Sequence, residues 1–142
     1  MGDARPRSNV VISVDTSVVV RYLVGTPADQ ARRAASLIDD EEVRIGVSVV
    51  ALAESAHVLR TQYDVEPRDI VDALIGFIQR ENVRVLEVRS DIVLESLVRA
   101  RLMPGRPIPD ALIVAGAIAA DALPLATFDV DQRGYGIAVR EP

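Results

Sequence analysis

Residues 108–131 constrain the fold more than any other stretch, because an almost entirely apolar segment carries an acid near each end. The Ala-, Ile-, Leu- and Val-rich part predicts a helix buried in a core, and this helix opens on Asp110. After a Leu-Pro turn, a short strand is predicted over 124–127, and it leads to Asp129. A carboxylate beside a core needs a partner or a cation. We therefore expect a metal ion between these acids.

The residue types that the chain lacks exclude many kinds of catalytic site. Its 142 residues include no cysteine and one histidine, and all 16 basic residues are arginine. Thiol nucleophiles, lysine Schiff bases, phosphate-loop lysines and His/Cys zinc sites are therefore excluded. What remains is oxygen chemistry from 21 acidic residues. Carboxylates select hard cations such as Mg²⁺ or Mn²⁺.

Length and hydropathy predict a single cytoplasmic domain. A chain of 142 residues suits one domain, which we place at residues 10–142, after a disordered leader over residues 1–9. No apolar run is long enough to predict a membrane span, and the N-terminus lacks the apolar segment of a signal peptide. The net charge of −5 argues against a general nucleic-acid-binding protein, unless a metal ion or a local basic surface offsets it.

Strand and helix signals alternate along the chain. Val10–Val14 is a continuous β-branched run, typical of a strand buried on both faces of a parallel sheet. Further strands are predicted over 43–47, 83–88, 124–127 and 136–139, and helices over 18–24, 27–38, 49–63, 67–81, 90–102 and 110–122. This alternation predicts an α/β fold, a three-layer α/β/α domain with a mostly parallel sheet of four to five strands.

Four acids occupy equivalent places in this predicted architecture. Asp15 and Asp129 each follow a strand directly, Glu54 lies two turns into the helix after the second strand, and Asp110 starts the helix before the fourth. Ligand sites of parallel α/β sheets lie outside the carboxyl ends of the strands, so all four acids can converge on one edge. Asp15, Glu54 and Asp110 are also each the only carboxylate in a long stretch.

Each acid also has a simpler structural explanation. Asp15 and Asp110 could cap helices or stabilise helix N-terminal dipoles, and Asp129 could belong to a turn. Glu54 has the weakest such explanation, because Val50 and Val58 flank it one turn away on either side. Four acids at equivalent places, three of them isolated in the sequence, favour a shared site over four separate structural roles.

Three arginines precede Asp110 closely: Arg99, Arg101 and Arg106. They could form a solvated helix end and loop, or a phosphate clamp beside the metal that would answer the net-charge objection. Arg106, in a loop rich in Pro and Gly, is our candidate for substrate binding.

Four motifs resemble the PIN-domain ribonucleases: Val-Asp-Thr-Ser at 14–17, Ala-Leu-Ala-Glu at 51–54, Pro-Asp-Ala-Leu-Ile-Val-Ala at 109–115 and Ala-Thr-Phe-Asp at 126–129. The resemblance extends from Val11 to about Val139. The size of the chain is similar to that of the VapC toxins of bacterial toxin–antitoxin pairs.

The resemblance implies endonucleolytic cleavage of RNA that depends on Mg²⁺ or Mn²⁺, by a homodimer that a cognate antitoxin inhibits. It implies Asp15, Glu54, Asp110 and Asp129 as catalytic residues. Asp15, Asp110 and Asp129 would bind the metal, and Glu54 would ligate it or orient the water. The ion would lower the pKa of a bound water and neutralise charge on the phosphate. Asp131 follows Asp129 by two residues, so which of the two lies nearer to the metal stays open.

Two other functions stay open. The acids could hold a basic segment of a partner, which would make the chain a non-catalytic PIN-like binding module; the net charge of −5 motivates this alternative. The same acids could instead serve a hydrolase acting on small phosphate esters. Metal binding by the isolated protein and turnover of a generic phosphate ester distinguish these alternatives from an endoribonuclease.

Overall fold

A computed structural model describes residues 11–102, 108–126 and 136–140 of the chain. In chain order, the elements in these ranges are β1 (Val11–Val14), α1 (Thr16–Val24), α2 (Ala28–Ile38), β2 (Arg44–Val47), α3 (Val49–Thr61), α4 (Pro67–Ile78), β3 (Val83–Val85), α5 (Ser90–Leu102), α6 (Ile108–Ala119), β4 (Leu125–Ala126) and β5 (Val139–Arg140). None of the described helices combines the length and the apolar composition that crossing a bilayer requires.

The strands pair in parallel throughout the described residues. β1, β2 and β3 form one sheet in that order, with Ile12 opposite Ile45 and Ile45 opposite Val83. β4 and β5 pair separately, with Leu125 opposite Val139. The predicted α/β fold with a parallel sheet is confirmed. The described strands differ from the prediction in forming a three-stranded and a two-stranded sheet instead of one sheet of four to five strands.

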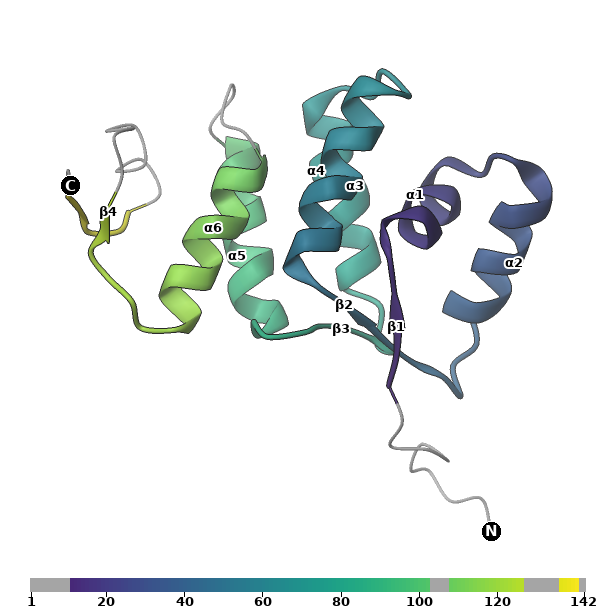
Figure 1. Cartoon of the computed structure of the whole chain (residues 1–142), viewed down its shortest axis with the longest axis horizontal. Helices are drawn as coiled ribbons and strands as arrows, with labels where there is room; N and C mark the ends of the chain where they lie inside the picture. The colour runs from purple at the N-terminus through teal and green to yellow at the C-terminus, as the bar shows by residue number, and fades with distance from the viewer. Residues whose placement is uncertain (1–10, 103–107, 127–135, 141–142) are drawn as a thin grey trace, which may run out of the picture.

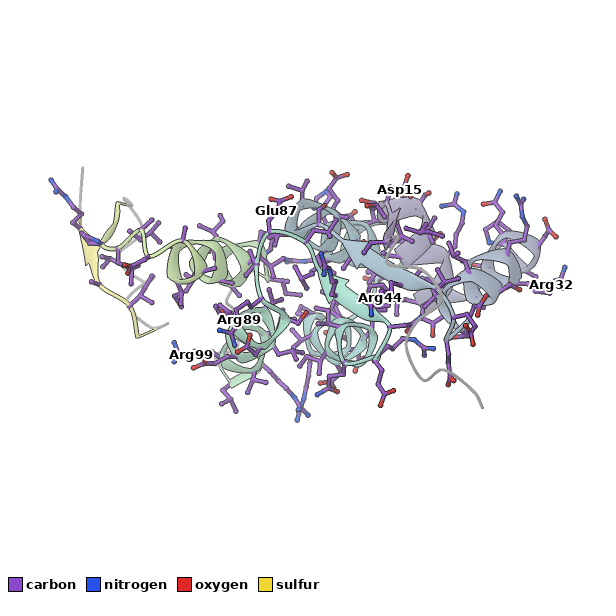
Figure 2. The ribbon with its side chains drawn as sticks, turned by 90° about the horizontal axis from the view of Figure 1, so that it is seen from below. Asp15, Arg32, Arg44, Glu87, Arg89 and Arg99 are labelled. Atoms are coloured by element: carbon purple, nitrogen blue, oxygen red, sulfur yellow. The ribbon has the colours of Figure 1, made fainter. Side chains whose placement is uncertain are left out.

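Helices cover both faces of the three-stranded sheet, with α1 and α3 on one face and α4 on the other (Figure 2). In Figure 1, α5 and α6 continue the row beyond α3 and α4, on the side away from α1, and β4 lies beyond α6. The main core contains fully buried side chains such as Val19, Leu52 and Leu74. A second, smaller cluster of Ala100, Ala111 and Val114 packs against Leu125 and Ile137, and so joins α5 and α6 to β4 and to the residues just before β5.

The helix boundaries follow local chemistry that the sequence displays. Asp15 caps α1 by accepting a hydrogen bond from the Val18 N–H, and Ser48 caps α3 by accepting one from the Ala51 N–H. Gly25 ends α1 with φ +84°, a left-handed conformation that glycine adopts without steric cost. Pro67 begins α4 at the first helical position, where its missing N–H is harmless.

Two features of the predicted elements are wrong. The N-terminal strand is not buried on both faces, although β-branched residues dominate it. β1 is also the first strand of its sheet and has one hydrogen-bonded neighbour among the described strands. Ile12 is 40% exposed and Ser13 is exposed, while Val14 is buried. The helix expected to start at Asp110 begins at Ile108, so Asp110 lies in its first turn.

Asn82 connects the start of β3 to the turn between α2 and β2. Its place in the sequence, just after a predicted helix, does not indicate this role. Its side-chain amide nitrogen donates to the carbonyl oxygens of Ile38 (2.9 Å), Asp40 (3.2 Å) and Val43 (3.0 Å). These carbonyls belong to the end of α2 and the turn that leads into β2. Asn82 therefore ties this turn to the start of β3, and it satisfies carbonyl groups that no helix or strand pairs.

Candidate active site

Asp15 and Glu54 line one cavity of about 460 Å³ between α1 and α3. Asp15 precedes α1, and Glu54 lies near the middle of α3. The remaining lining residues come from the same two helices and from the residues just after α3: Thr16, Ser17, Val20, Arg21, Val58, Gln62 and Tyr63. The structure thus brings together two acids that are separated by almost forty residues, as the sequence predicts.

Asp15 is held in a fixed orientation by its position at the start of α1. Its Oδ1 accepts hydrogen bonds from the Ser17 hydroxyl (2.6 Å) and from the Val18 N–H (3.2 Å). These donors, led by Ser17, hold the pKa of the Asp15 carboxyl below its ordinary value. A carboxylate is also the charge that a helix N-terminus favours. The Asp15 side chain is exposed, and the hydrogen bonds from Ser17 and Val18 favour its ionised form.

Replacing Ser17 by alanine is expected to raise the pKa of Asp15 toward its ordinary value, because the strongest donor to the ionised form is lost. A lowered pKa stabilises the fold above the unfolded-state pKa of about 4, and this contribution is lost as the pH falls through the folded-state pKa. With Ser17→Ala, that contribution becomes smaller and its loss begins at a higher pH. Titration of the Asp15 carboxyl by ¹³C NMR measures the shift, and an unchanged pKa would contradict it.

Glu54 lines the cavity from α3, and among the described residues no hydrogen bond or ion pair fixes its carboxylate. Glu54, Val58 and Gln62 are spaced four residues apart, which places them on one face of the helix, and all three line the cavity. The Glu54 side chain is exposed, and no hydrogen-bond or ion-pair partner is found for it among the described residues. Its carboxylate is therefore available to a ligand that enters the cavity.

The groups around the cavity suit a hard divalent cation. Besides Asp15 and Glu54, the lining residues Thr16, Ser17, Gln62 and Tyr63 carry side-chain oxygen atoms. Ions such as Mg²⁺ and Mn²⁺ prefer such oxygen ligands. The described residues supply two carboxylates at this cavity. Nowhere in the described parts of the chain do three Asp, Glu, His or Cys side chains come close enough together to hold a metal ion.

The other predicted site residues do not join Asp15 and Glu54 in the described structure. Asp110 is half-buried in the first turn of α6 and does not line the cavity. Figure 1 shows α3 between α1 and α6. Asp129, the alternative ligand Asp131, and Arg106 lie outside the described residues. The metal-binding roles of Asp110 and Asp129 and the substrate-binding role of Arg106 stay predictions.

The two described arginines of the predicted phosphate clamp both form ion pairs, one within its own helix and one with a neighbouring helix. Arg99 pairs with Glu95 at 2.9 Å within α5, and Arg101 pairs with Asp72 of α4 at 3.2 Å. All four side chains are partly exposed, and pairs of this kind contribute little to stability. These contacts agree with the simpler explanation, a solvated helix end.

Sequence reasoning missed the basic and polar residues of the cavity: Arg21, Gln62 and Tyr63. Helical spacing gives a partial signal, since Arg21 follows Ser17 by four residues and Gln62 follows Val58 by four. That spacing places Arg21 on the face of Ser17 and Gln62 on the face of Val58 and Glu54, but only the packing of α1 against α3 shows that these faces meet.

Comparison with protein-family models places this geometry in a known family. The model described as "PIN domain" matches residues 12–137, almost the whole chain. The chain belongs to the PIN-domain family. PIN domains are generally nucleases that use divalent metals, so a nuclease-type fold carries the Asp15–Glu54 cavity. Comparison with curated proteins finds no significant match.

Proposed function

We propose that this PIN domain is a Mg²⁺- or Mn²⁺-dependent endoribonuclease and the toxin of a toxin–antitoxin pair. One observation carries the proposal: Asp15 and Glu54, from motifs far apart in the sequence, line one oxygen-rich cavity in a chain of this family. The placing of Asp110 and Asp129 as further metal ligands is part of the same proposal. Both residues lie in the motifs that carry the resemblance to PIN-domain ribonucleases.

In the proposed reaction, the protein holds the metal ion and positions the water that attacks the phosphodiester. When bound, a divalent ion supplies positive charge beside the phosphodiester and makes water more acidic. Asp15, ionised and oriented by Ser17 and the first turn of α1, holds negative charge at a fixed place in the cavity. Glu54, with an unengaged carboxylate on the opposite wall, orients the attacking water and accepts its proton. Hydrolysis then leaves one product with a phosphate and the other with a hydroxyl.

The partners follow from the same assignment. A toxin of this kind acts in the cytoplasm, where RNA is available, and we propose that it forms a homodimer. A cognate antitoxin would inhibit it, and an arginine-rich antitoxin segment would complement the Asp15–Glu54 cavity by charge. The net charge of −5 supports a basic partner.

The function is tested by incubating the full chain with mixed cellular RNA. Discrete fragments are expected with Mg²⁺ or Mn²⁺, and none with EDTA, because removal of the ion leaves the two carboxylates to repel the phosphate. Fragments should return when Mn²⁺ is added in excess over EDTA. Gel electrophoresis of end-labelled RNA measures cleavage. Equal cleavage in EDTA would contradict a metal-dependent mechanism.

Two outcomes would select the alternatives. Turnover of p-nitrophenyl phosphate without RNA cleavage would assign the site to small phosphate esters. Tight binding of an arginine-rich peptide, with neither cleavage nor calorimetric uptake of Mg²⁺, would make the chain a non-catalytic binding module.

A further inference from the structure

A second cavity adjoins the Asp15–Glu54 cavity along α1. It has a volume of about 390 Å³ and lies between α1 and α2. The residues that line it are Ser17, Val18, Arg21, Gln30, Arg33, Ala34 and Leu37. Ser17 and Arg21 line both cavities, so the two spaces meet at these residues. We call the second cavity the α1–α2 groove.

Arg21 is fixed at the boundary between the two spaces. Its Nη1 donates to the Ser17 carbonyl oxygen at 3.2 Å, and its Nε donates to the side-chain oxygen of Gln30 on α2. Its remaining N–H groups have no described partner. Arg21 also contributes to the lowered pKa of Asp15, as the smallest of its causes. A guanidinium already held in place loses little further freedom when it binds a phosphate, and its planar fork matches the phosphate oxygens.

Arg33 extends the positive charge along the groove. It is exposed on α2, and no hydrogen-bond or ion-pair partner is found for it among the described residues. Its neighbour Arg32 differs, because Arg32 pairs with Asp29 at 3.3 Å and does not line the groove. None of the described residues that line the groove is acidic. The α1–α2 groove is thus a basic surface directly beside the acid pair.

We propose that the α1–α2 groove binds the backbone phosphates of single-stranded RNA next to the phosphate that is cleaved. The inference rests on the proposed function, since it takes the Asp15–Glu54 cavity as the place of cleavage. Arg21 contacts the first phosphate beyond that cavity, and Arg33 contacts a phosphate further along the strand. Contacts of this kind position the strand without reading its sequence. They also offset, locally, the repulsion between RNA and a chain of net charge −5.

The test measures RNA binding without cleavage. The full chain carrying Asp15→Asn, in Mg²⁺, is titrated into a fluorescent single-stranded RNA of mixed sequence, and anisotropy is followed at several salt concentrations. Adding Arg33→Gln is expected to weaken binding about tenfold. It should also reduce the salt dependence by about 0.7 in the slope of log K against log salt, the loss of one phosphate contact. Arg32→Gln, the matched control on the same helix, should leave both unchanged.

Equal losses from Arg33→Gln and Arg32→Gln would overturn the inference, since they would reflect net charge alone. No loss from Arg33→Gln, or no RNA binding by the parent protein, would overturn it too. Cleavage by the wild-type chain is measured separately. If the wild-type chain cleaves RNA and Arg33→Gln leaves binding unaltered, the proposed function stands and the role of the groove is rejected. If Arg33→Gln weakens binding but the wild-type chain does not cleave RNA, the proposed function is rejected.

Discussion

Replacing Asp15 by asparagine is expected to lower metal-dependent RNA cleavage by about 100-fold or more, because even groups that only orient metal ligands are worth 10–100-fold. Asparagine removes the negative charge from the cavity that Asp15 shares with Glu54. It keeps the shape of the side chain and remains a good helix cap, so the hydrogen bond from the Val18 N–H is retained. The loss of activity should therefore occur without a loss of fold. Initial rates on a defined RNA substrate measure it.

The matched control is Asp69→Asn, which makes the same change at the start of another helix. Asp69 lies in the first turn of α4 and does not line the Asp15–Glu54 cavity. Its replacement should leave the cleavage rate within about twofold, since surface substitutions away from special features have small effects. Thermal melting should show both variants folded. Cleavage by Asp15→Asn at the wild-type rate would remove Asp15 from the mechanism.

Replacing Leu52 by alanine is expected to lower the free energy of unfolding by about 2–5 kcal/mol. Leu52 is fully buried in the main core, on the helix that presents Glu54 to the cavity. Its truncation removes buried apolar surface and leaves a void that close-packed neighbours fill only in part. Urea denaturation followed by circular dichroism measures the change. Because α3 forms one wall of the site, we also expect the cleavage rate of Leu52→Ala to fall at the urea concentrations at which this variant unfolds.

Val50→Ala provides the comparison on the same helix. Val50 is 65% exposed, so its truncation removes little buried surface and should change the free energy of unfolding by about 0.5 kcal/mol or less. A similar cost for Leu52→Ala and Val50→Ala would show that α3 is not anchored in the core by Leu52. It would then remove the physical reason for the placement of Glu54.

The parts of the fold that depend on neighbouring residues are those that the sequence predicts well. Asp15 and Ser48 cap their helices, and Gly25 ends α1, because each acts on backbone groups within a few residues. The order of strands and helices follows equally from local hydrophobic patterns. These elements establish the α/β class without information about which strands are neighbours.

The parts that depend on distant contacts were missed or wrong. A β-branched run does not tell whether β1 has one neighbouring strand or two, or whether other elements cover both of its faces. Ile12 is 40% exposed, and β1 has a single described neighbour. The sequence places Asn82 just after a helix predicted over 67–81, but its side-chain amide donates to carbonyls about forty residues earlier in the chain. Such contacts leave no periodic mark in the sequence.

Part of the candidate site could be predicted from the sequence, and part depends on contacts between distant segments. The convergence of Asp15 and Glu54 could be predicted because the carboxyl ends of adjacent parallel strands share an edge, and β1 and β2 are adjacent. The same reasoning for Asp110 and Asp129 requires the strand after α6 to lie beside β1. The described β4 pairs with β5 instead. Arg21 was missed because its role arises only from the meeting of α1 with α2 and α3.

The account depends most on divalent-ion binding between Asp15 and Glu54, and Mn²⁺ titration followed by NMR tests this most directly. Bound Mn²⁺ broadens nearby amide signals. We predict that the signals of residues 15–18 and of Glu54 disappear first, and that Asp15→Asn suppresses this selective loss. First losses at other exposed acids, such as Asp69 or Asp91, or uniform broadening without any preferred site, would contradict the account.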